Sequence, residues 1–191
     1  NDEGFKGVVI KIKTQAMEIL PDGILADAGC VTVALAQVSM QNGFTGFEWG
    51  VGIPGTIGGA VRGNAGAMGA ETKDSVESVS VYSDGEVTEF SNKDCEFGYR
   101  DSVFKQALKD AYIITHVRFQ LSKKATVKLQ YGDIAAELTQ QHIHSPSPLD
   151  VARAVIRIRQ RKLPDPAKIG NAGSFFKNPV IPTEQLEKIK E

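Results

Sequence analysis

Glycine is concentrated in residues 50–69, which read GVGIPGTIGGAVRGNAGAMG. Glycine clustered this densely indicates special backbone geometry, and the small neighbours would let a bulky, phosphate-bearing ligand approach the main chain. The stretch is not a P-loop, because no Gly-Lys-Ser/Thr follows, and it lacks the GxGxxG spacing of a Rossmann strand. Two interpretations stay open: a nucleotide cofactor bound by a different fold, or a tightly turned structural loop.

The charge balance excludes several classes of protein. The 191 residues contain 22 Lys plus Arg against 23 Asp plus Glu, so no global field recruits nucleic acid or an anionic membrane. Cys30 and Cys95 have no metal-ligand or disulfide-scaffold spacing and fit a reducing compartment. No apolar run approaches the roughly 20 residues that cross a bilayer. We therefore expect a cytoplasmic protein with no metal site and no nucleic-acid or membrane partner.

Strands and helices are mixed without a regular βαβ period, which predicts an α+β fold with an antiparallel sheet. Ser147, Pro148 and Asp150 fit the start of a helix that carries a capping box. A second helix is expected over 31–38, with Gly43 ending it. The hydrophobic patterns predict two or three short strands in 8–35, the first at 8–12, with turns at 21–23 and 28–29. They also predict a hairpin of 76–82 with 86–90, and strands at 111–121 and 126–129.

Two further segments carry chemistry-bearing residues. In 97–105, Arg100 could hold a carboxylate or a developing enolate by a charge-assisted pair, or it could belong to an Arg100–Asp101 turn. In 170–179, Ser174 between Gly and Phe could present a hydroxyl to a partly dry pocket, or act as an ordinary turn residue. Ser174 is not in a nucleophile elbow, so a Ser-His-Asp hydrolase is disfavoured.

A basic stretch at 153–162 has Arg153, Arg157 and Arg161 at helical i, i+4 spacing. With Lys162, these arginines could grip a diphosphate, or they could form a solvated cationic face. The segment 163–166, Leu-Pro-Asp-Pro, is expected to end the helix.

Taken together, residues 52–67, 99–102 and 170–179 resemble the UDP-N-acetylenolpyruvylglucosamine reductase family, in that family's order and at about its separations. The resemblance implies an FAD-binding fold of the UDP-N-acetylmuramate dehydrogenase (PCMH) type. It assigns 1–13 to the tail of a first FAD-binding subdomain, 14–162 to a second, and 163–191 to the start of a substrate-binding subdomain. The family's diphosphate-binding glycine segment and C-terminal glutamate have no counterpart here. We therefore expect a fragment of a three-subdomain protein.

The resemblance also implies a reaction: NADPH reduces FAD, and the enolpyruvyl group of UDP-N-acetylglucosamine enolpyruvate is then reduced to UDP-N-acetylmuramate for peptidoglycan synthesis. Arg100 matches the residue that stabilises the developing aci-enolate, and Ser174 matches the proton donor. The motifs assign substrate contacts to Tyr99, Tyr131, Lys162 and Asn178. They assign flavin contacts to Ile53, Pro54, Gly55, Thr56, Gly58, Gly59, Ala60, Gly69 and Arg159.

Two alternatives to the reductase are kept. The chain could be a flavin-binding fragment without turnover, because the diphosphate segment and the glutamate are absent. It could instead be a flavin oxidase of the same broad fold with another substrate, which the arginine and serine motifs disfavour. The oligomeric state is not predicted.

Overall fold

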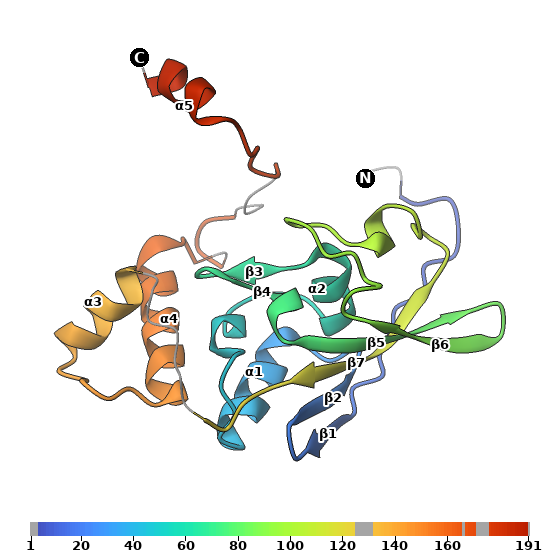
Figure 1. Ribbon diagram of the computed structural model, residues 1–191, viewed down its shortest axis with the longest axis horizontal. Helices are drawn as coiled ribbons and strands as arrows, with labels where there is room; N and C mark the ends of the chain where they lie inside the picture. The colour runs from blue at the N-terminus through green and yellow to red at the C-terminus, as the bar shows by residue number, and fades with distance from the viewer. Residues whose placement is uncertain (1–3, 125–131, 166, 171–175, 191) are drawn as a thin grey trace.

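A five-stranded antiparallel sheet forms the centre of the protein, in the order β1-β2-β7-β5-β6 (Figure 1). The computed structural model describes residues 4–124, 132–165, 167–170 and 176–190. The strands of this sheet are Met17–Leu20 (β1), Gly23–Asp27 (β2), Val76–Ser83 (β5), Glu86–Ser91 (β6) and Ile113–Gln120 (β7). Two short strands, Gly66–Ala67 (β3) and Ala70–Glu71 (β4), pair separately. The expected α+β class with an antiparallel sheet is confirmed.

Helices flank this sheet. They are Thr32–Gln41 (α1), Ile57–Gly63 (α2), Gly132–Gln140 (α3), Pro148–Lys162 (α4) and Thr183–Lys190 (α5), with 3-10 turns at Glu48–Gly50, Thr72–Asp74 and Val103–Lys105. α1 and α2 contact β2, and α2 also contacts β7. α3 packs on α4, which in turn contacts the 3-10 turn Glu48–Gly50. α5 lies apart from the sheet in Figure 1.

The core lies between the sheet and the helices. Its largest fully buried side chains include Phe44, Phe47, Phe119, Ile24 and Leu35. The ring of Phe47 meets that of Phe119 at a centroid distance of 5.4 Å, which ties the segment before α2 to the central strand β7. Burial of this apolar surface supplies the main driving force for folding. The chain just before the glycine-rich stretch, at Phe47, is therefore anchored in the core.

The hairpin and the capping box are confirmed. Asp84 and Gly85 join β5 to β6 with φ angles of 50° and 90°, as a two-residue turn with both φ angles positive requires. Ser147 caps α4: its backbone N–H donates to the carboxylate of Asp150, and the N–H of Asp150 donates to the Ser147 hydroxyl. The helix ends at Lys162, before Pro164, as expected.

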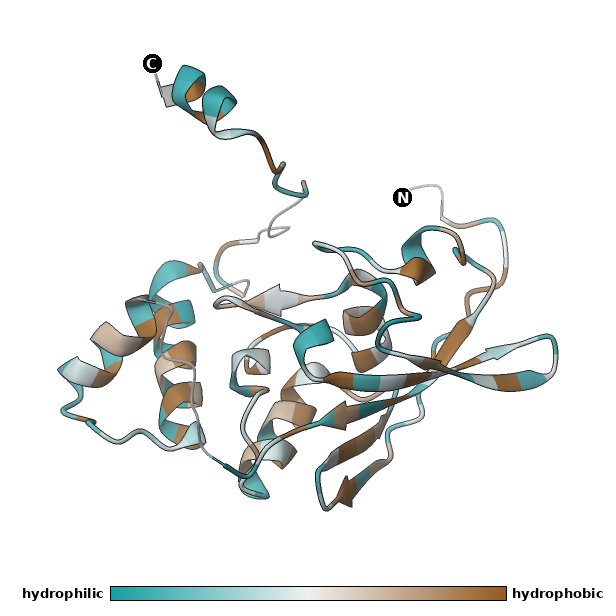
Figure 2. Ribbon diagram, viewed as in Figure 1, coloured by the Kyte–Doolittle hydropathy of each residue, from teal (hydrophilic) through white to brown (hydrophobic). Residues whose placement is uncertain are grey.

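α4 buries one side, Val151, Ala154, Val155 and Ile158, at the i, i+3, i+4, i+7 spacing of an amphipathic helix. Figure 2 shows hydrophobic and hydrophilic residues on different sides of this helix. The basic residues of 153–162 therefore lie beside a buried face rather than on an isolated helix.

One strand prediction is wrong. Residues 8–12 form no strand, and Val8, Val9 and Ile10 are at least 76% exposed. Valine and isoleucine favour strands only where a neighbouring strand accepts them, and this run pairs with none of the described strands. The strand expected at 126–129 lies outside the described residues. Among the described helices, none has the length and apolar character to span a membrane.

Candidate functional site

The glycine-rich loop leads from the 3-10 turn Glu48–Gly50 into α2. Gly52 and Gly55 have φ angles of +78° and +115°, which L side chains rarely adopt. The loop is anchored to α1 because the N–H of Thr32 donates to the carbonyl of Gly55 at 3.1 Å. Thr56 begins the helix, and its hydroxyl accepts from the N–H of Gly59. The loop is thus a defined backbone path.

Gly58 and Gly59, which are adjacent in α2, lie in different surroundings. A Cβ added to Gly58 would lie 3.0 Å from the Cβ of Ala28, so close packing on the residue after β2 accounts for Gly58. At Gly59 the only near atom is the Thr56 hydroxyl oxygen, at 3.5 Å, and φ is not positive. Nothing in the fold of the described residues requires glycine at Gly59. A ligand that approaches the exposed backbone there would require it.

A pocket of about 280 Å³ opens beside these glycines. Its lining is largely apolar, and it brings the start of α2 next to the end of β2 and the start of β7. The lining residues are Ile12, Ala28, Thr56, Gly58, Gly59, Arg62, Phe104, Asp110, Tyr112, Ile113 and Ile114. The volume fits part of a dinucleotide cofactor, and the open backbone at Gly59 fits its close approach. Thr56, Gly58 and Gly59, three of the predicted flavin contacts, meet here.

Arg159 of α4 lies against the same loop. A Cβ on Gly52 would be 2.9 Å from its Nε, so the guanidinium occupies the space that a side chain at position 52 would fill. Two segments about 100 residues apart, both predicted to hold the flavin, are therefore in contact. Ile53, Pro54 and Gly55 belong to this loop but line neither pocket described here, and Ala60 is buried in the core.

Arg100 sits in a tight turn. The N–H of Asp101 donates to the carbonyl of Gly98 at 3.2 Å, the N–H of Gly98 donates back to Asp101 at 3.0 Å, and Arg100 has a φ of +54°. A left-handed conformation costs a non-glycine residue about 1 kcal/mol or more, and such residues cluster at functional sites. The turn expected by one interpretation exists, and Arg100 lines a pocket. That Arg100 holds a carboxylate stays a prediction.

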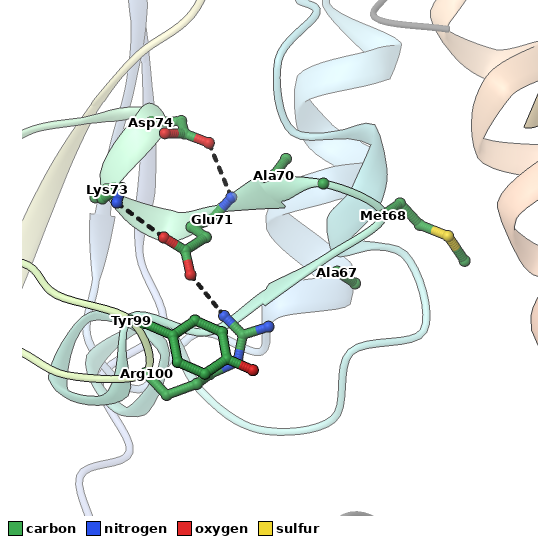
Figure 3. Close-up of a pocket in the computed structure, with 9 residues that line it drawn as sticks. Ala67, Met68, Ala70, Glu71, Lys73, Asp74, Tyr99 and Arg100 are labelled. Carbon is green, nitrogen blue, oxygen red and sulfur yellow. Dashed lines mark hydrogen bonds and ion pairs between the residues drawn. The ribbon is translucent and has the colours of Figure 1, made fainter. Parts of the chain in front are cut away.

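The guanidinium of Arg100 is held by three acceptors. It donates to Glu71 Oε1 at 2.8 Å, to the Gly66 carbonyl at 2.9 Å and to the Asn64 carbonyl at 3.3 Å. Figure 3 shows Glu71 between Lys73 and Arg100, with the ring of Tyr99 beside the guanidinium. The guanidinium carbon lies 5.0 Å from the centroid of that ring. Sequence reasoning missed Glu71.

These residues line a second pocket, of about 660 Å³. It lies between the β3–β4 hairpin and the turn that holds Arg100. Its lining is Ala67, Met68, Gly69, Ala70, Glu71, Lys73, Asp74, Tyr99 and Arg100. Met68 and Gly69 form the hairpin tip with φ angles of 55° and 78°. Gly69, a predicted flavin contact, thus meets Tyr99 and Arg100, which were predicted to serve the substrate.

Asn64 joins the two halves of this second pocket. Its side chain is fully buried, and its amide donates to the carbonyl of Gly98 at 2.7 Å and to Glu71 Oε2 at 3.1 Å. Its side-chain oxygen accepts from the N–H of Lys73 at 3.1 Å. Asparagine at the end of α2 also tolerates the φ of 42° found there. The motif at 64–67 contained this residue, but only the fold shows that it links three segments.

The third motif, 170–179, contacts the second motif, 97–105, through Lys177 and Tyr99. Lys177 Nζ lies 5.7 Å from the centroid of the Tyr99 ring, which also contacts Arg100. A hydrogen bond from Gln106 lowers the pKa of the Asp101 carboxyl, and the charges of Lys177 and Lys105 contribute further. Asn178 is exposed in the next position. Ser174 and Tyr131, by contrast, lie outside the described residues.

Two arginines of the basic helix have a partner that neither interpretation expected. Arg157 and Arg161 both donate to the carboxylate of Glu137 in α3, at 2.7 and 3.2 Å, although Glu137 is only 4% exposed. The pKa of Glu137 is lowered, first by the hydrogen bond from Arg157 and then by Arg161. These two arginines are therefore neither a free diphosphate grip nor a simple solvated face. They fasten α3 to α4.

Lys162 forms an ion pair with Asp133 at the start of α3. Both side chains keep more than a third of their surface exposed, so the ammonium can still meet a solvent-borne ligand. Among the described residues, no group of three or more His, Cys, Asp or Glu side chains could hold a metal ion.

The chain is similar to known proteins along most of its length. Residues 1–91 match a family described as an FAD binding domain. UDP-N-acetylenolpyruvoylglucosamine reductases from Chromobacterium violaceum and Pseudomonas aeruginosa are 43% and 39% identical to the chain over 195 and 193 residues, covering 98% and 97% of it. The enzyme of that name from Bdellovibrio bacteriovorus is 44% identical over 187 residues and 94% of the chain.

A solved structure is also similar. The crystal structure of UDP-N-acetylenolpyruvylglucosamine reductase from Thermus caldophilus matches with a TM-score of 0.55 and 29% identity, over 74% of this chain and 44% of that one. The chain spans 55–57% of the length of the three relatives named above. Similarity of this extent along nearly all of its length means that the chain belongs to the UDP-N-acetylenolpyruvoylglucosamine reductase family.

Proposed function

We propose that the protein carrying this chain is an FAD-dependent reductase that uses NADPH to reduce the enolpyruvyl group of UDP-N-acetylglucosamine enolpyruvate to UDP-N-acetylmuramate. The observation that carries the proposal is the pocket of about 660 Å³ with the guanidinium of Arg100 in its wall. Family membership supplies the substrate class. We place the reaction in the cytoplasm, in peptidoglycan synthesis.

The cofactor is assigned to the glycine-rich loop. Gly59 leaves the backbone open beside a largely apolar pocket, which suits a flavin nucleotide. When bound, FAD accepts hydride from NADPH and supplies hydride to the substrate double bond. In this proposal the residues that hold and orient the cofactor are Ile53, Pro54, Gly55, Thr56, Gly58, Gly59, Ala60, Gly69 and Arg159.

Arg100 is assigned to the substrate carboxylate. Hydride addition to an enol ether conjugated with a carboxylate places negative charge on that carboxylate, and a fixed cation stabilises the charge as it develops. Ser174 is assigned as the donor of the proton that the adjacent carbon then receives. Tyr99, Tyr131, Lys162 and Asn178 are assigned to the sugar and diphosphate of the substrate. The subdomain limits at residues 13 and 162 belong to the same proposal.

The experiment is an absorbance measurement on the purified protein with FAD under anaerobic conditions. NADPH should bleach the flavin band near 450 nm, and added UDP-N-acetylglucosamine enolpyruvate should restore it, with UDP-N-acetylmuramate identified by mass spectrometry. Bleaching without recovery would contradict the proposed substrate. FAD binding without bleaching would favour the alternative, a flavin-binding chain without turnover, which the partial coverage of the relatives keeps in play.

A further inference from the structure

We propose that Glu71 is a positioning residue that holds Arg100 in the orientation needed to bind the substrate carboxylate. The inference rests on the proposed function and adds to it a residue that no motif assigned. Its basis is a network in which Glu71, in the lining of the second pocket, contacts Arg100, Lys73 and Asn64. Figure 3 shows the contacts with Arg100 and Lys73.

Arg100 has more N–H donors than its partners in the described residues use. A guanidinium has five of them in a rigid plane. Three are used by acceptors in the described part of the chain: Glu71 Oε1, the Gly66 carbonyl and the Asn64 carbonyl. The remaining two can serve a ligand in the pocket that Arg100 lines. The rest of the fork is thus available for a carboxylate.

Glu71 is held in place by contacts other than the one with Arg100. Its Oε2 accepts from Lys73 Nζ at 3.0 Å and from Asn64 Nδ2 at 3.1 Å. Its backbone N–H donates to Asp74 Oδ2 at 2.9 Å. The Glu71 side chain is only 19% exposed. A carboxylate held this firmly can orient a long and otherwise flexible arginine side chain.

Gly66 leaves room for the ion pair between Glu71 and Arg100. A Cβ at Gly66 would lie 2.9 Å from Arg100 Nη1, 2.9 Å from Glu71 Cγ and 2.4 Å from the Ala70 carbonyl oxygen. The absence of a side chain at position 66 therefore makes room for the ion pair. The glycine, the glutamate and the arginine come from three different segments, and their contacts depend on one another.

The charged side chains that line the second pocket balance one another. Arg100 and Lys73 contribute two positive charges to the pocket lining, and Glu71 and Asp74 contribute two negative charges. A neutral lining does not attract an anionic substrate by net charge. Recognition of a carboxylate then depends on how the guanidinium is aimed, which makes the residue that aims it important for the reaction.

The test uses Glu71→Gln, Glu71→Asp and a control, Glu77→Gln, in the FAD-loaded protein. Glu77 pairs with Arg118 on the sheet and lies outside the lining of the second pocket. Glutamine cannot replace both carboxylate oxygens, because its NH₂ group would face the donors of Arg100 or those of Lys73 and Asn64. Thermal melting of each variant identifies any that fail to fold.

We expect Glu71→Gln to slow flavin reoxidation by the enolpyruvyl substrate by on the order of 10- to 100-fold, as misplacement of a reacting group does. Flavin reduction by NADPH should stay within about twofold, since Arg100 acts only on the substrate carboxylate. Glu71→Asp should recover part of the lost rate, and Glu77→Gln should match the wild type in both half-reactions. Calorimetric titration with UDP-N-acetylmuramate should show weaker binding to Glu71→Gln.

A double-mutant cycle separates positioning from a general structural role. If Glu71 acts through Arg100, adding Glu71→Gln to Arg100→Ala should cause almost no further loss. Full additivity, or equal loss in both half-reactions, would overturn the proposal. A wild-type protein that fails to reoxidise with the substrate would contradict the proposed function instead. A wild-type protein that works beside an unimpaired Glu71→Gln variant would contradict only the role of Glu71.

Discussion

Glu137 in α3 accepts a hydrogen bond of 2.7 Å from Arg157 in α4, and a second arginine, Arg161, reaches its other carboxylate oxygen. The carboxylate is almost fully buried, whereas Arg157 and Arg161 keep 36% and 59% of their side-chain surface exposed. These ion pairs connect α3 to α4, and α4 carries Arg159, which lies against the glycine-rich loop.

Glu137→Gln should destabilise the protein. Breaking a fully buried pair costs roughly 3–5 kcal/mol, and because both arginines remain partly in water we expect about 1–2 kcal/mol here. Urea unfolding at pH 7 measures the change. Glu184→Gln in the exposed helix α5 is the control and should leave the free energy of unfolding unchanged.

The same pair predicts a pH dependence. The pKa of Glu137 in the folded protein lies below its ordinary value of 4.5, so the unfolded chain takes up the proton first as the pH falls. The pair stabilises the fold fully above about pH 4.5, and its contribution disappears as the pH drops through the lowered pKa. The stability difference between wild type and Glu137→Gln should therefore shrink steadily below that pH. A constant difference would contradict the assignment.

Ser147→Ala should remove the cap of α4 and cost about 1 kcal/mol. The hydroxyl of Ser147 receives the N–H of Asp150, and its own contact with the Asp150 carboxylate is the main reason that the pKa of this carboxyl is lowered. Ser145→Ala is a matched change, because Ser145 is exposed and precedes the helix without capping it. The free energies of unfolding of the two variants, measured by denaturation, should differ by the contribution of the cap, about 1 kcal/mol.

Gly59→Ala should have opposite effects on the fold and on the cofactor. Without FAD, alanine in this helix should stabilise by roughly 0.5–1 kcal/mol, because the added Cβ meets only ordinary contacts. FAD affinity, measured by fluorescence quenching, should fall, since the methyl group blocks the approach to the backbone. Gly63→Ala is the control in the same helix: nothing lies within 4 Å of its Cβ, and FAD binding should persist. Unchanged affinity in Gly59→Ala would refute the ligand explanation for this glycine.

The two thiols should be unreactive in the native protein. Burial raises the pKa of Cys95 to about 12, and burial followed by the charge of Asp27 raises that of Cys30. Because the thiolate is the reactive form, iodoacetamide at pH 7.5 should modify neither residue until urea unfolds the chain. Mass spectrometry of the intact protein counts the added groups. Rapid native labelling would show that the residue reacting is more accessible than the structure indicates.

Arg100→Ala should slow the second half-reaction by on the order of 10²–10³-fold, the usual effect of removing a donor that stabilises developing charge. Reduction of the flavin by NADPH should change little. Arg118→Ala, which removes a guanidinium paired with Asp22 and Glu77 on the sheet, serves as the matched variant. Stopped-flow absorbance separates the two steps, and an unimpaired Arg100→Ala would remove Arg100 from the mechanism.

The sequence predicted those parts of the fold that depend on interactions between residues close together in the chain. The Asp84-Gly85 turn and the Ser147 cap carry short-range chemistry, so their strands and helix were located to within a few residues. Val8–Ile12 misled because an isolated run of β-branched residues does not reveal whether a neighbouring strand exists. The α3 helix was missed, since its buried Glu137 is stabilised by arginines that lie 20 residues or more further along the chain.

The candidate site was predictable only as separate motifs. Glycine density pointed to the loop, and Arg100 stood out among aromatic residues, but neither pattern contains a distance. Glu71 gave no signal of its own, and Asn64 stood only as one residue of a motif. Both become partners of Arg100 only when the β3–β4 hairpin meets the turn at 98–101. The assignments of Ser174 and Tyr131 remain predictions.

The place of β7 in the sheet has a consequence for biosynthesis. This strand lies between β2 and β5, yet about 85 residues of the chain separate its start from the end of β2. At roughly 5–20 residues per second, β1 and β2 wait several seconds or more on the ribosome before their neighbour emerges. A nascent chain stalled before residue 113 would expose the inner edges of both hairpins, and such unpaired edges can pair with another chain.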